Sequence, residues 1–273
     1  MSALDETFAA ARAEGRGVLV GYLPAGAAPD DTFTAMVEAG VDVFEVGLPY
    51  SDPVIDGPVI QQAVDRALAA GTTPADVLRT VEQVAATGVP VLVMTYWNPV
   101  EQYGVESFAA DLAAAGGAGM ITPDLTPEEA GPWLAAADKH ELAPVFLVAP
   151  SSTGDRIARI AGLCRGFVYA TSVMGVTGAR QRTSAAAPGL VARVRAVTDL
   201  PVGVGLGVST AGQAAEIAGY ADAVIVGSAF VRTVLDGGSP AALAGELAAG
   251  VRRPVRQPVP SAEPPDAPGL DGV

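Results

Sequence analysis

Short apolar runs rich in β-branched residues alternate with helix-patterned segments along most of the 273-residue chain. This alternation is typical of βαβ units, in which helices connect parallel strands and cover the sheet. Eight strands are predicted, at residues 18–23, 41–47, 89–96, 118–123, 143–149, 166–171, 201–207 and 222–228. Eight strands with intervening helices favour a closed (β/α)8 barrel, the TIM barrel, over an open sheet.

Several segments fall outside this repeat. An amphipathic, acidic N-terminus predicts an extra helix before the first strand, and residues 58–70 and 73–87 predict two helices between the second and third strands. Residues 172–189, after the sixth strand, predict a long mobile loop. The last twenty residues contain six prolines, so we expect a disordered tail at 253–273, dispensable for catalysis, and a single catalytic domain at 1–252.

The charge and the apolar pattern limit the partners and the compartment. A net charge of −14 argues against nucleic acid and against anionic membrane surfaces as partners. The N-terminus lacks the pattern of a signal peptide, and no apolar run reaches the length of a membrane span. With one cysteine, an intramolecular disulfide is excluded, and we expect a cytoplasmic protein.

Histidine and lysine are scarce, which narrows the possible chemistry. The single histidine, His140, and the single lysine, Lys139, are adjacent, at the end of a predicted helix and before a strand. In α/β folds that position lies opposite the face where active sites form. Schiff-base chemistry, a Ser-His-Asp triad, a Cys-His pair and a His-rich metal site are therefore disfavoured, and acid–base chemistry is expected from Asp, Glu or Tyr.

Two carboxylates and a tyrosine are expected at the carboxyl ends of the strands. Glu45 interrupts the apolar second strand, Asp56 lies in the loop that follows, and Tyr169 lies near the end of the sixth strand. A buried, unpaired carboxylate is costly, so it is usually paired or in use. From the residues alone, Glu45 could instead pair with an arginine, Asp56 could shape a turn, and Tyr169 could pack in the core. Asp124 is predicted to be a loop or capping residue.

Glycine-containing segments follow the sixth, seventh and eighth strands, at 175–178, 205–209 and 226–230. Glycine lets backbone N–H groups approach an anion, and a helix N-terminus adds a favourable dipole. Each segment by itself is typical of a tight turn. Together, at three successive strand ends, they favour a phosphate site, with a short helix beginning at Gly227 and Ser228.

The segment FEVGLPYSDPVIDGPVIQ, residues 44–61, resembles the most characteristic stretch of the tryptophan synthase alpha subunit family. Further similar segments follow in the family's order: MTYWNP, ITPDLTPEE, YATSVMGVTGAR, GLGVST and VIVGSAFV. The resemblance extends from about residue 18 to about residue 235. It implies a carbon–carbon lyase of tryptophan biosynthesis that splits indole-3-glycerol phosphate into indole and glyceraldehyde 3-phosphate, with no cofactor or metal of its own.

The resemblance also implies roles for individual residues. Glu45 would be the catalytic acid–base residue, and Asp56 would hold the indole N–H. Thr177 would belong to a mobile loop that closes over Asp56, and Leu206 would pack against the indole ring. The implied substrate-binding residues are Tyr169, Thr177, Gly178, Leu206, Gly207, Gly227 and Ser228, of which the glycines and Ser228 would form the phosphate cradle.

One departure from the family pattern lies after the first strand. The family commonly has Gly-Asp-Pro there, whereas Ala27 follows Gly26 in this chain and the carboxylates come later, at Asp30 and Asp31. This departure removes any role for an acid directly after Gly26. Neither Glu45 nor Asp56 is affected.

The family further implies a partner, a pyridoxal-phosphate-dependent beta subunit that makes L-tryptophan from indole and L-serine, in an alpha2beta2 heterotetramer. The segments YSDPV and NPVEQ, with the segment after the sixth strand, would form or adjoin the docking face, and Asp52 would shape the loop there. Two alternatives remain open. The chain could be a stand-alone indole-releasing lyase of secondary metabolism, or a catalytically silent barrel that only activates its partner.

Overall fold

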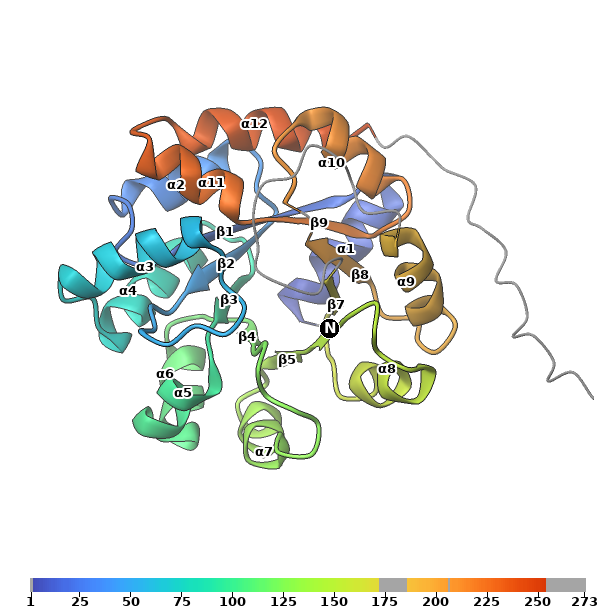
Figure 1. Ribbon diagram of the computed structural model, residues 1–273, viewed down its shortest axis with the longest axis horizontal. Helices are drawn as coiled ribbons and strands as arrows, with labels where there is room; N and C mark the ends of the chain where they lie inside the picture. The colour runs from blue at the N-terminus through green and yellow to red at the C-terminus, as the bar shows by residue number, and fades with distance from the viewer. Residues whose placement is uncertain (1, 172–185, 206, 254–273) are drawn as a thin grey trace, which may run out of the picture.

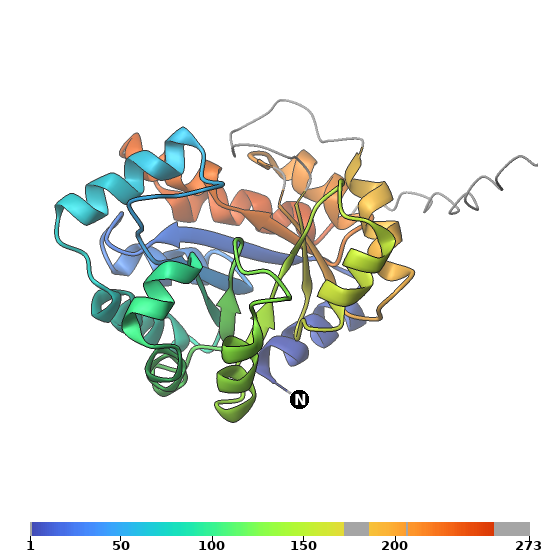
Figure 2. The same cartoon turned by 60° about the horizontal axis from the view of Figure 1, so that its bottom comes forward.

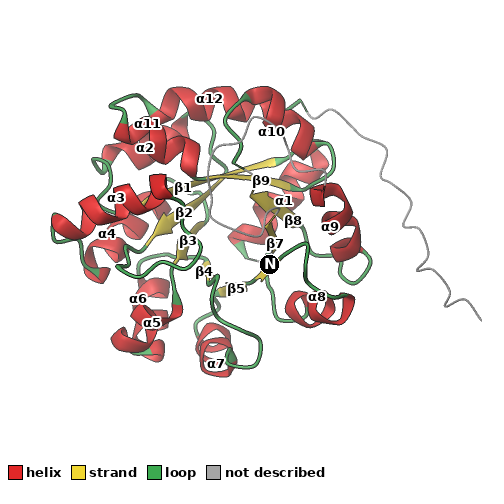
Figure 3. Ribbon diagram, in the orientation of Figure 1, coloured by secondary structure: helices red, strands yellow, loops and turns green. Residues whose placement is uncertain are grey.

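The strands of this protein form a ring of parallel β-structure enclosed by helices (Figures 1 and 3). The computed structural model describes residues 2–171, 186–205 and 207–253. The strands are β1 (Val18–Pro24), β2 (Val43–Gly47), β3 (Val91–Met94), β4 (Gly119–Ile121), β5 (Ala143–Val145), β6 (Leu147–Val148), β7 (Val168–Thr171), β8 (Val202–Gly205) and β9 (Ala223–Val226). Every strand predicted from the sequence has a counterpart, and the (β/α)8 barrel is confirmed.

The ring closes through the predicted fifth strand, which is divided into β5 and β6. The hydrogen-bonded order is β5-β4-β3-β2-β1-β9-β8-β7-β6, so β5 pairs with β4 while β6 pairs with β7. Phe146, between the two halves, accepts a hydrogen bond from the N–H of Tyr169 at 3.2 Å. Its own N–H faces the Cys164 Sγ at 3.4 Å. One barrel strand therefore changes neighbour at Phe146, and the nine segments make an eight-stranded barrel.

Helices cover the outside of the ring in chain order, apart from the first helix, which lies across one end (Figure 1). They are α1 (Ala3–Ala13), α2 (Asp31–Glu38), α3 (Pro58–Ala69), α4 (Pro74–Ala85), α5 (Trp97–Tyr103), α6 (Val105–Ala114), α7 (Gly131–Lys139), α8 (Gly154–Ala161), α9 (Ala186–Arg195), α10 (Ala211–Ala218), α11 (Ser228–Leu235) and α12 (Pro240–Val251). The N-terminal helix, the two helices between the second and third strands and the short helix after the last strand are confirmed.

Local sequence explains where several of these helices begin. Ser2 and Asp5 form a capping box at the start of α1, and Thr73 and Asp76 form another at α4. In a capping box each side chain accepts a hydrogen bond from the other residue's backbone N–H, which satisfies donors that the first helical turn leaves free. Pro74 occupies the first position of α4, where proline's missing N–H costs nothing.

Helix α1 closes one end of the barrel, as Figure 2 shows. Its Leu4, Phe8 and Ala11 join a buried cluster with inward-facing side chains of the strands, and the Phe8 and Phe167 ring centroids lie 5.6 Å apart. Burial of a side chain such as Phe8 contributes about 1.5–3 kcal/mol to folding. The barrel interior at this end is therefore apolar and filled.

Two carboxylates tie strands together at the same, amino-terminal end. Asp42, just before β2, accepts the backbone N–H of Leu19 at 2.8 Å and pairs with Arg16 at 3.0 Å. Asp222, just before β9, accepts the first N–H of β8 at 2.9 Å and pairs with Arg195 at 3.0 Å. Each carboxylate thus joins the start of one strand to its neighbour and is neutralised by an arginine.

Two of the predicted segments fall mostly or wholly beyond the described ranges. Of the predicted loop at 172–189, residues 172–185 lie outside the described residues, and of the predicted tail only Arg253 lies within them. The division into a domain at 1–252 and a tail at 253–273 stays a prediction. Across the described ranges, no helix combines the length and the apolar character that crossing a bilayer requires.

Candidate active site

Glu45 faces the inside of the barrel from the middle of β2. It lies in register with Tyr22 of β1 and Leu92 of β3, and its exposed fraction is 1%. Its Oε1 atom has no hydrogen-bond partner among the described residues. Burial raises the pKa of Glu45 to about 8. No arginine or lysine of the described ranges affects the pKa of Glu45. The alternative that Glu45 pairs with an arginine is therefore not supported there.

Asp56 lies in the loop between β2 and α3, directly before Gly57, which precedes the first turn of α3. Its carboxyl group is hydrogen-bonded to the hydroxyl of Tyr96, a buried residue just after β3. The same hydroxyl accepts the backbone N–H of Ile55 at 3.1 Å. Burial raises the pKa of Asp56, and the Tyr96 hydrogen bond opposes that rise. Tyr96 therefore fastens the Asp56 loop to the end of a neighbouring strand.

Two further tyrosines face this pair of carboxylates. Burial raises the pKa of Tyr22 and of Tyr169 well above the usual range, and the negative charges of Glu45 and Asp56 add to the rise in both. Both phenols therefore stay protonated and can donate hydrogen bonds. The structure brings Glu45, Asp56 and Tyr169 to one end of the barrel, as expected from the sequence.

Glycines on adjacent strands make room for these rings. A Cβ atom added to Gly47 would lie 2.5 Å from the Tyr22 hydroxyl oxygen, and one added to Gly205 would lie 2.6 Å from the Tyr169 hydroxyl oxygen. No side chain fits at such distances without displacing the ring. Each tyrosine thus lies over a strand-end glycine of its neighbour, Gly47 on β2 and Gly205 on β8.

The described part of the predicted phosphate cradle lies at the ends of β8 and β9. Gly227 precedes the first turn of α11, and Ser228 is its first residue, with an exposed fraction of 7%. Gly207 has φ of 64° and lies between β8 and α10. Thr177, Gly178 and Leu206 lie outside the described residues. The role of these residues in phosphate binding stays a prediction.

Tyr22 and Tyr96 were not singled out from the sequence. Both lie towards the carboxyl ends of predicted strands, where this fold gathers its chemistry, and that position was the available signal. A tyrosine in a strand more often packs in the core, so the residue type gave little reason to select either.

The other titratable residues considered from the sequence have structural contacts. Both oxygens of Asp124 accept the backbone N–H of Trp97, at 3.0 and 3.1 Å, at the start of α5, so its capping role is confirmed. Lys139 and His140, at the end of α7, contact Glu106. The described residues contain no group of three or more His, Cys, Asp or Glu side chains that could hold a metal ion.

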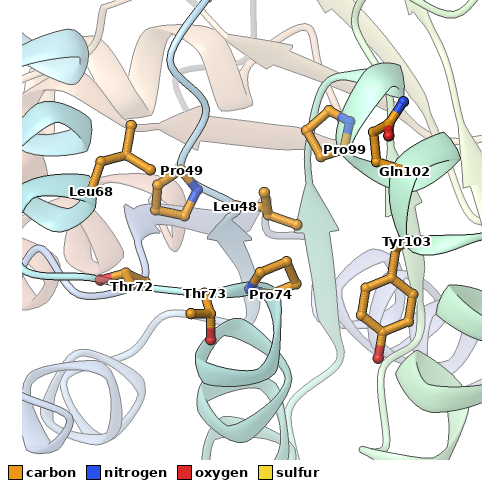
Figure 4. A pocket seen from close by; sticks show the side chains of 9 residues that line it. All are labelled: Leu48, Pro49, Leu68, Thr72, Thr73, Pro74, Pro99, Gln102 and Tyr103. Atoms are coloured by element: carbon orange, nitrogen blue, oxygen red, sulfur yellow. The ribbon is translucent and has the colours of Figure 1, made fainter.

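A pocket of about 370 Å³ lies beside the mouth of the barrel (Figure 4). Leu48 and Pro49 line it from the β2–α3 loop, and Pro99 and Gln102 line it from α5. The tip of the same loop carries Val54, whose exposed fraction is 73%. The pocket thus brings residues of NPVEQ beside Leu48 and Pro49, which directly precede YSDPV, and the Tyr50 ring centroid lies 5.5 Å from that of Tyr96. The role of these segments as a docking face stays a prediction.

Comparisons with known proteins agree on one family. A family model described as tryptophan synthase alpha chain matches residues 8–249. The tryptophan synthase alpha chain of Acidothermus cellulolyticus is 64% identical over 263 residues, covering 93% of this chain and 98% of that relative. The tryptophan synthase alpha chain of Salinispora arenicola is 64% identical over 265 residues, covering 93% of this chain and 99% of that relative.

Solved structures are similar over the same extent. A chain of Mycobacterium tuberculosis tryptophan synthase gives a TM-score of 0.88 with 56% identity, covering 92% of this chain and 98% of that one. Tryptophan synthase subunit alpha from Legionella pneumophila gives a TM-score of 0.79 with 33% identity, covering 93% of this chain and 98% of that one. The similarity thus includes the whole barrel.

Proposed function

The chain belongs to the tryptophan synthase alpha chain family, and we propose on that basis how its barrel cleaves indole-3-glycerol phosphate into indole and glyceraldehyde 3-phosphate. This is the reaction of a carbon–carbon lyase in tryptophan biosynthesis. The observation that carries the proposed mechanism is Glu45, a buried carboxyl group with an unpartnered oxygen among the described residues, which faces the same two tyrosines, Tyr22 and Tyr169, as Asp56.

Asp56 stabilises the charge that develops on the indole ring. Cleavage of the bond between indole C3 and the glycerol phosphate chain is a retro-aldol reaction that begins with protonation of C3. That step places positive charge on the indole nitrogen, and an ionised carboxylate beside the N–H stabilises it. The hydrogen bond from Tyr96 favours the ionised form of Asp56 against the effect of burial.

Glu45 transfers the protons. With a pKa of about 8, Glu45 is mainly protonated near neutral pH. It gives its proton to C3, and the resulting carboxylate then takes the proton of the side-chain hydroxyl next to the breaking bond. As that hydroxyl becomes the aldehyde, the C3 bond breaks, its electrons return to the ring, and Glu45 is protonated again. Positioned proton transfer of this kind contributes about 10²–10⁴ in rate.

The remaining binding residues hold the two ends of the substrate. Gly207, Gly227 and Ser228, together with Gly178, offer backbone N–H groups and the start of α11 to the phosphate. Tyr169 lines the ring site, and the family resemblance assigns Leu206 to the indole ring and Thr177 to the loop that closes over Asp56. Anchoring both ends supplies the orientation that proton transfer requires.

The partner that fits this function is a tryptophan synthase beta subunit in an alpha2beta2 complex. Support comes from the exposed Val54 and from the pocket between the β2–α3 loop and α5. This pocket provides a hollow beside the predicted docking face into which partner side chains can pack. The pyridoxal phosphate of the complex belongs to the beta subunit, and this chain uses no cofactor of its own. A cytoplasmic location fits these partners.

The test measures indole release from indole-3-glycerol phosphate by the purified chain, with and without an added beta subunit. We expect detectable release by the isolated chain and a large rise in turnover with the partner. An unchanged turnover would indicate a stand-alone lyase and contradict the proposed partner. Absence of indole under both conditions, with a correctly folded barrel by circular dichroism, would contradict the lyase activity.

A further inference from the structure

Tyr96 occupies the N-cap position of α5, yet its side chain does not cap that helix. The side chain makes no capping hydrogen bond. The residue is buried instead, with an exposed fraction of 5%, and its hydroxyl accepts the backbone N–H of Ile55 at 3.1 Å. The first turn of α5 thus lacks the acceptor that an N-cap side chain usually provides, because Tyr96 holds the loop that carries Asp56.

Asp124 supplies an acceptor at this helix end from a different loop. It lies after β4, and both of its carboxylate oxygens accept the backbone N–H of Trp97, the first residue of α5, at 3.0 and 3.1 Å. The two residues are 27 positions apart in the chain. The contact therefore ties the segment after β3 to the loop after β4, and it does so at the peptide unit that joins Tyr96 to Trp97.

The direction of the Tyr96 side chain depends on that peptide unit. The unit is planar, and its carbonyl oxygen accepts the hydroxyl of Thr95 at 3.0 Å, so both of its polar groups are held. With the unit fixed, Tyr96 keeps an extended backbone with ψ of 160°, and its ring lies against that of Tyr50 in the β2–α3 loop, with centroids 5.5 Å apart. A small rotation of the peptide unit is magnified at the Tyr96 hydroxyl, because the hydroxyl lies at the far end of the side chain.

We propose that Asp124 is a positioning residue, whose hydrogen bonds to Trp97 hold Tyr96 in the orientation in which its hydroxyl fixes the backbone next to Asp56. The inference rests on the proposed function, in which Asp56 stabilises the charge on the indole nitrogen. Asp124 acts only through Tyr96. Misplacement of a group by about 1 Å can cost about 10² in rate, so the contact has a consequence for catalysis beyond the capping of α5.

Hydrogen exchange at the Ile55 amide, followed by NMR, tests the placement of Tyr96 without an assay of activity. Asp124→Ala removes both acceptor oxygens, so the Tyr96 hydroxyl that accepts the Ile55 N–H is displaced. We expect exchange at Ile55 to become about two- to tenfold faster, the factor that corresponds to one typical hydrogen bond. Faster exchange at the start of α5 alone would make Asp124 a cap and nothing more, and would overturn the proposal. Asp124→Asn keeps an acceptor oxygen, and we expect the wild-type exchange rate from it.

A double-mutant cycle in the kcat of indole release tests whether Asp124 acts through Tyr96. We expect Asp124→Ala and Tyr96→Phe each to lower kcat by about tenfold. The double variant should be no slower than the slower single variant, because both substitutions release the same loop. Effects that multiply would mean that Asp124 acts independently of the Tyr96 hydroxyl. We expect near-wild-type kcat from Asp124→Asn, and a loss equal to that of Asp124→Ala would assign the effect to charge; either result would overturn the proposal.

Asp222→Ala is the matched control. Asp222 also accepts a backbone N–H from a residue distant in the chain, that of Val202 at 2.9 Å, but at the amino-terminal end of the barrel. We expect it to leave kcat and exchange at Ile55 unchanged. Asp124 is exposed, so the barrel should stay folded without its contact, and urea unfolding checks this for each variant.

The outcomes separate this inference from the proposed function. If the wild type releases indole but Asp124→Ala keeps the wild-type kcat, the lyase activity stands and the role of Asp124 is wrong. Absence of indole release by the wild type would contradict the proposed function, and with it the catalytic part of this inference, even where exchange at Ile55 responds as expected.

Discussion

The two ends of the barrel surround their carboxylates in opposite ways. At the amino-terminal end, Asp42 and Asp222 each accept a backbone N–H and pair with an arginine. At the carboxyl-terminal end, Glu45 and Asp56 face tyrosine side chains, and no cation of the described residues acts on their pKa values. Asp42 and Glu45 are near neighbours on the same stretch of chain, so the difference comes from what surrounds each position.

The contrast separates a structural use of acidic residues from a reactive one. A carboxylate that accepts a backbone N–H and pairs with an arginine has its charge and its hydrogen-bonding capacity matched by neighbours, and its contribution is to the folded state. A carboxyl group buried without a cation costs stability, and its pKa moves towards the range in which it can exchange protons. Glu45, with a pKa of about 8, is in the second situation.

The largest expected effect comes from Glu45→Gln, which keeps the shape of the side chain and removes its proton transfer. We expect kcat for indole release to fall by about 10²–10⁴, with no loss of stability, since a neutral amide replaces a group that is costly to ionise. Steady-state kinetics and urea unfolding at neutral pH measure the two effects. Near-normal cleavage would remove Glu45 from the catalytic role.

A smaller loss is expected for Asp56→Asn, because the substitution removes stabilisation of the indole cation but leaves the proton donor. By comparison with loss of one electrostatic contact in other active sites, we expect kcat to fall by about 10²–10³. The same steady-state assay applies, with Asp52→Asn in the exposed part of the same loop as the matched control. Equal effects of the two substitutions would contradict the special role of Asp56.

The contribution of Glu45 to the stability of the protein should fall as the pH rises from acid to neutral. The pKa of Glu45 is raised from 4.5 to about 8 in the folded state, so the folded protein binds more protons than the unfolded chain between these values. The stabilising contribution is fully present below the unfolded pKa and is lost as the pH approaches the folded value. Between about pH 5.5 and pH 7.5 the loss from this group amounts to about 2–3 kcal/mol.

Urea unfolding across that pH range measures the slope, and Glu45→Gln is the control. The variant lacks the titrating group, so its stability should fall less over the same range. Equal slopes for the two proteins would mean that Glu45 titrates alike in the folded and unfolded states, and the contrast between the two ends of the barrel would lose its physical basis.

The smallest expected effect is at the structural end. Asp222→Ala removes the acceptor for the first N–H of β8 and the partner of Arg195. We expect a loss of about 1–2 kcal/mol in the free energy of unfolding, with kcat unchanged, because the site lies at the far end of the strands. Thermal unfolding and the indole assay together check both parts. A large fall in kcat without a loss of stability would contradict the division of roles.

Much of the barrel could be predicted because its strands are short apolar runs of regular spacing. The unusual placement of Glu45 was visible too, as an acidic residue in such a run. The division of the fifth strand at Phe146 was not predictable, because it depends on which neighbour each half meets when the ring closes. Closure is a property of the whole barrel and leaves no local mark in the sequence.

The contacts around the carboxylates were less accessible from the sequence. Arg16 and Asp42 are 26 residues apart, and Tyr96 reaches Ile55 across 41 residues. Such pairs depend on strand register and on side-chain direction, and a single sequence contains neither. Tyr22 illustrates the difficulty, because the position of its ring depends on glycine at 47 and 227, where a Cβ atom would crowd the ring, and not on its own residue type.

Helix α1 closes the amino-terminal end of the barrel. Among the described residues, Leu4, Phe8 and Ala11 fill that end, so it offers no path to the substrate or the products, and exchange with solvent takes place at the carboxyl-terminal mouth. A protein surface that covers the mouth therefore controls the entry of substrate and the exit of products. Indole then leaves only along a path that this surface provides. The N-terminal helix, far from any reacting atom, in this way sets the direction of product release.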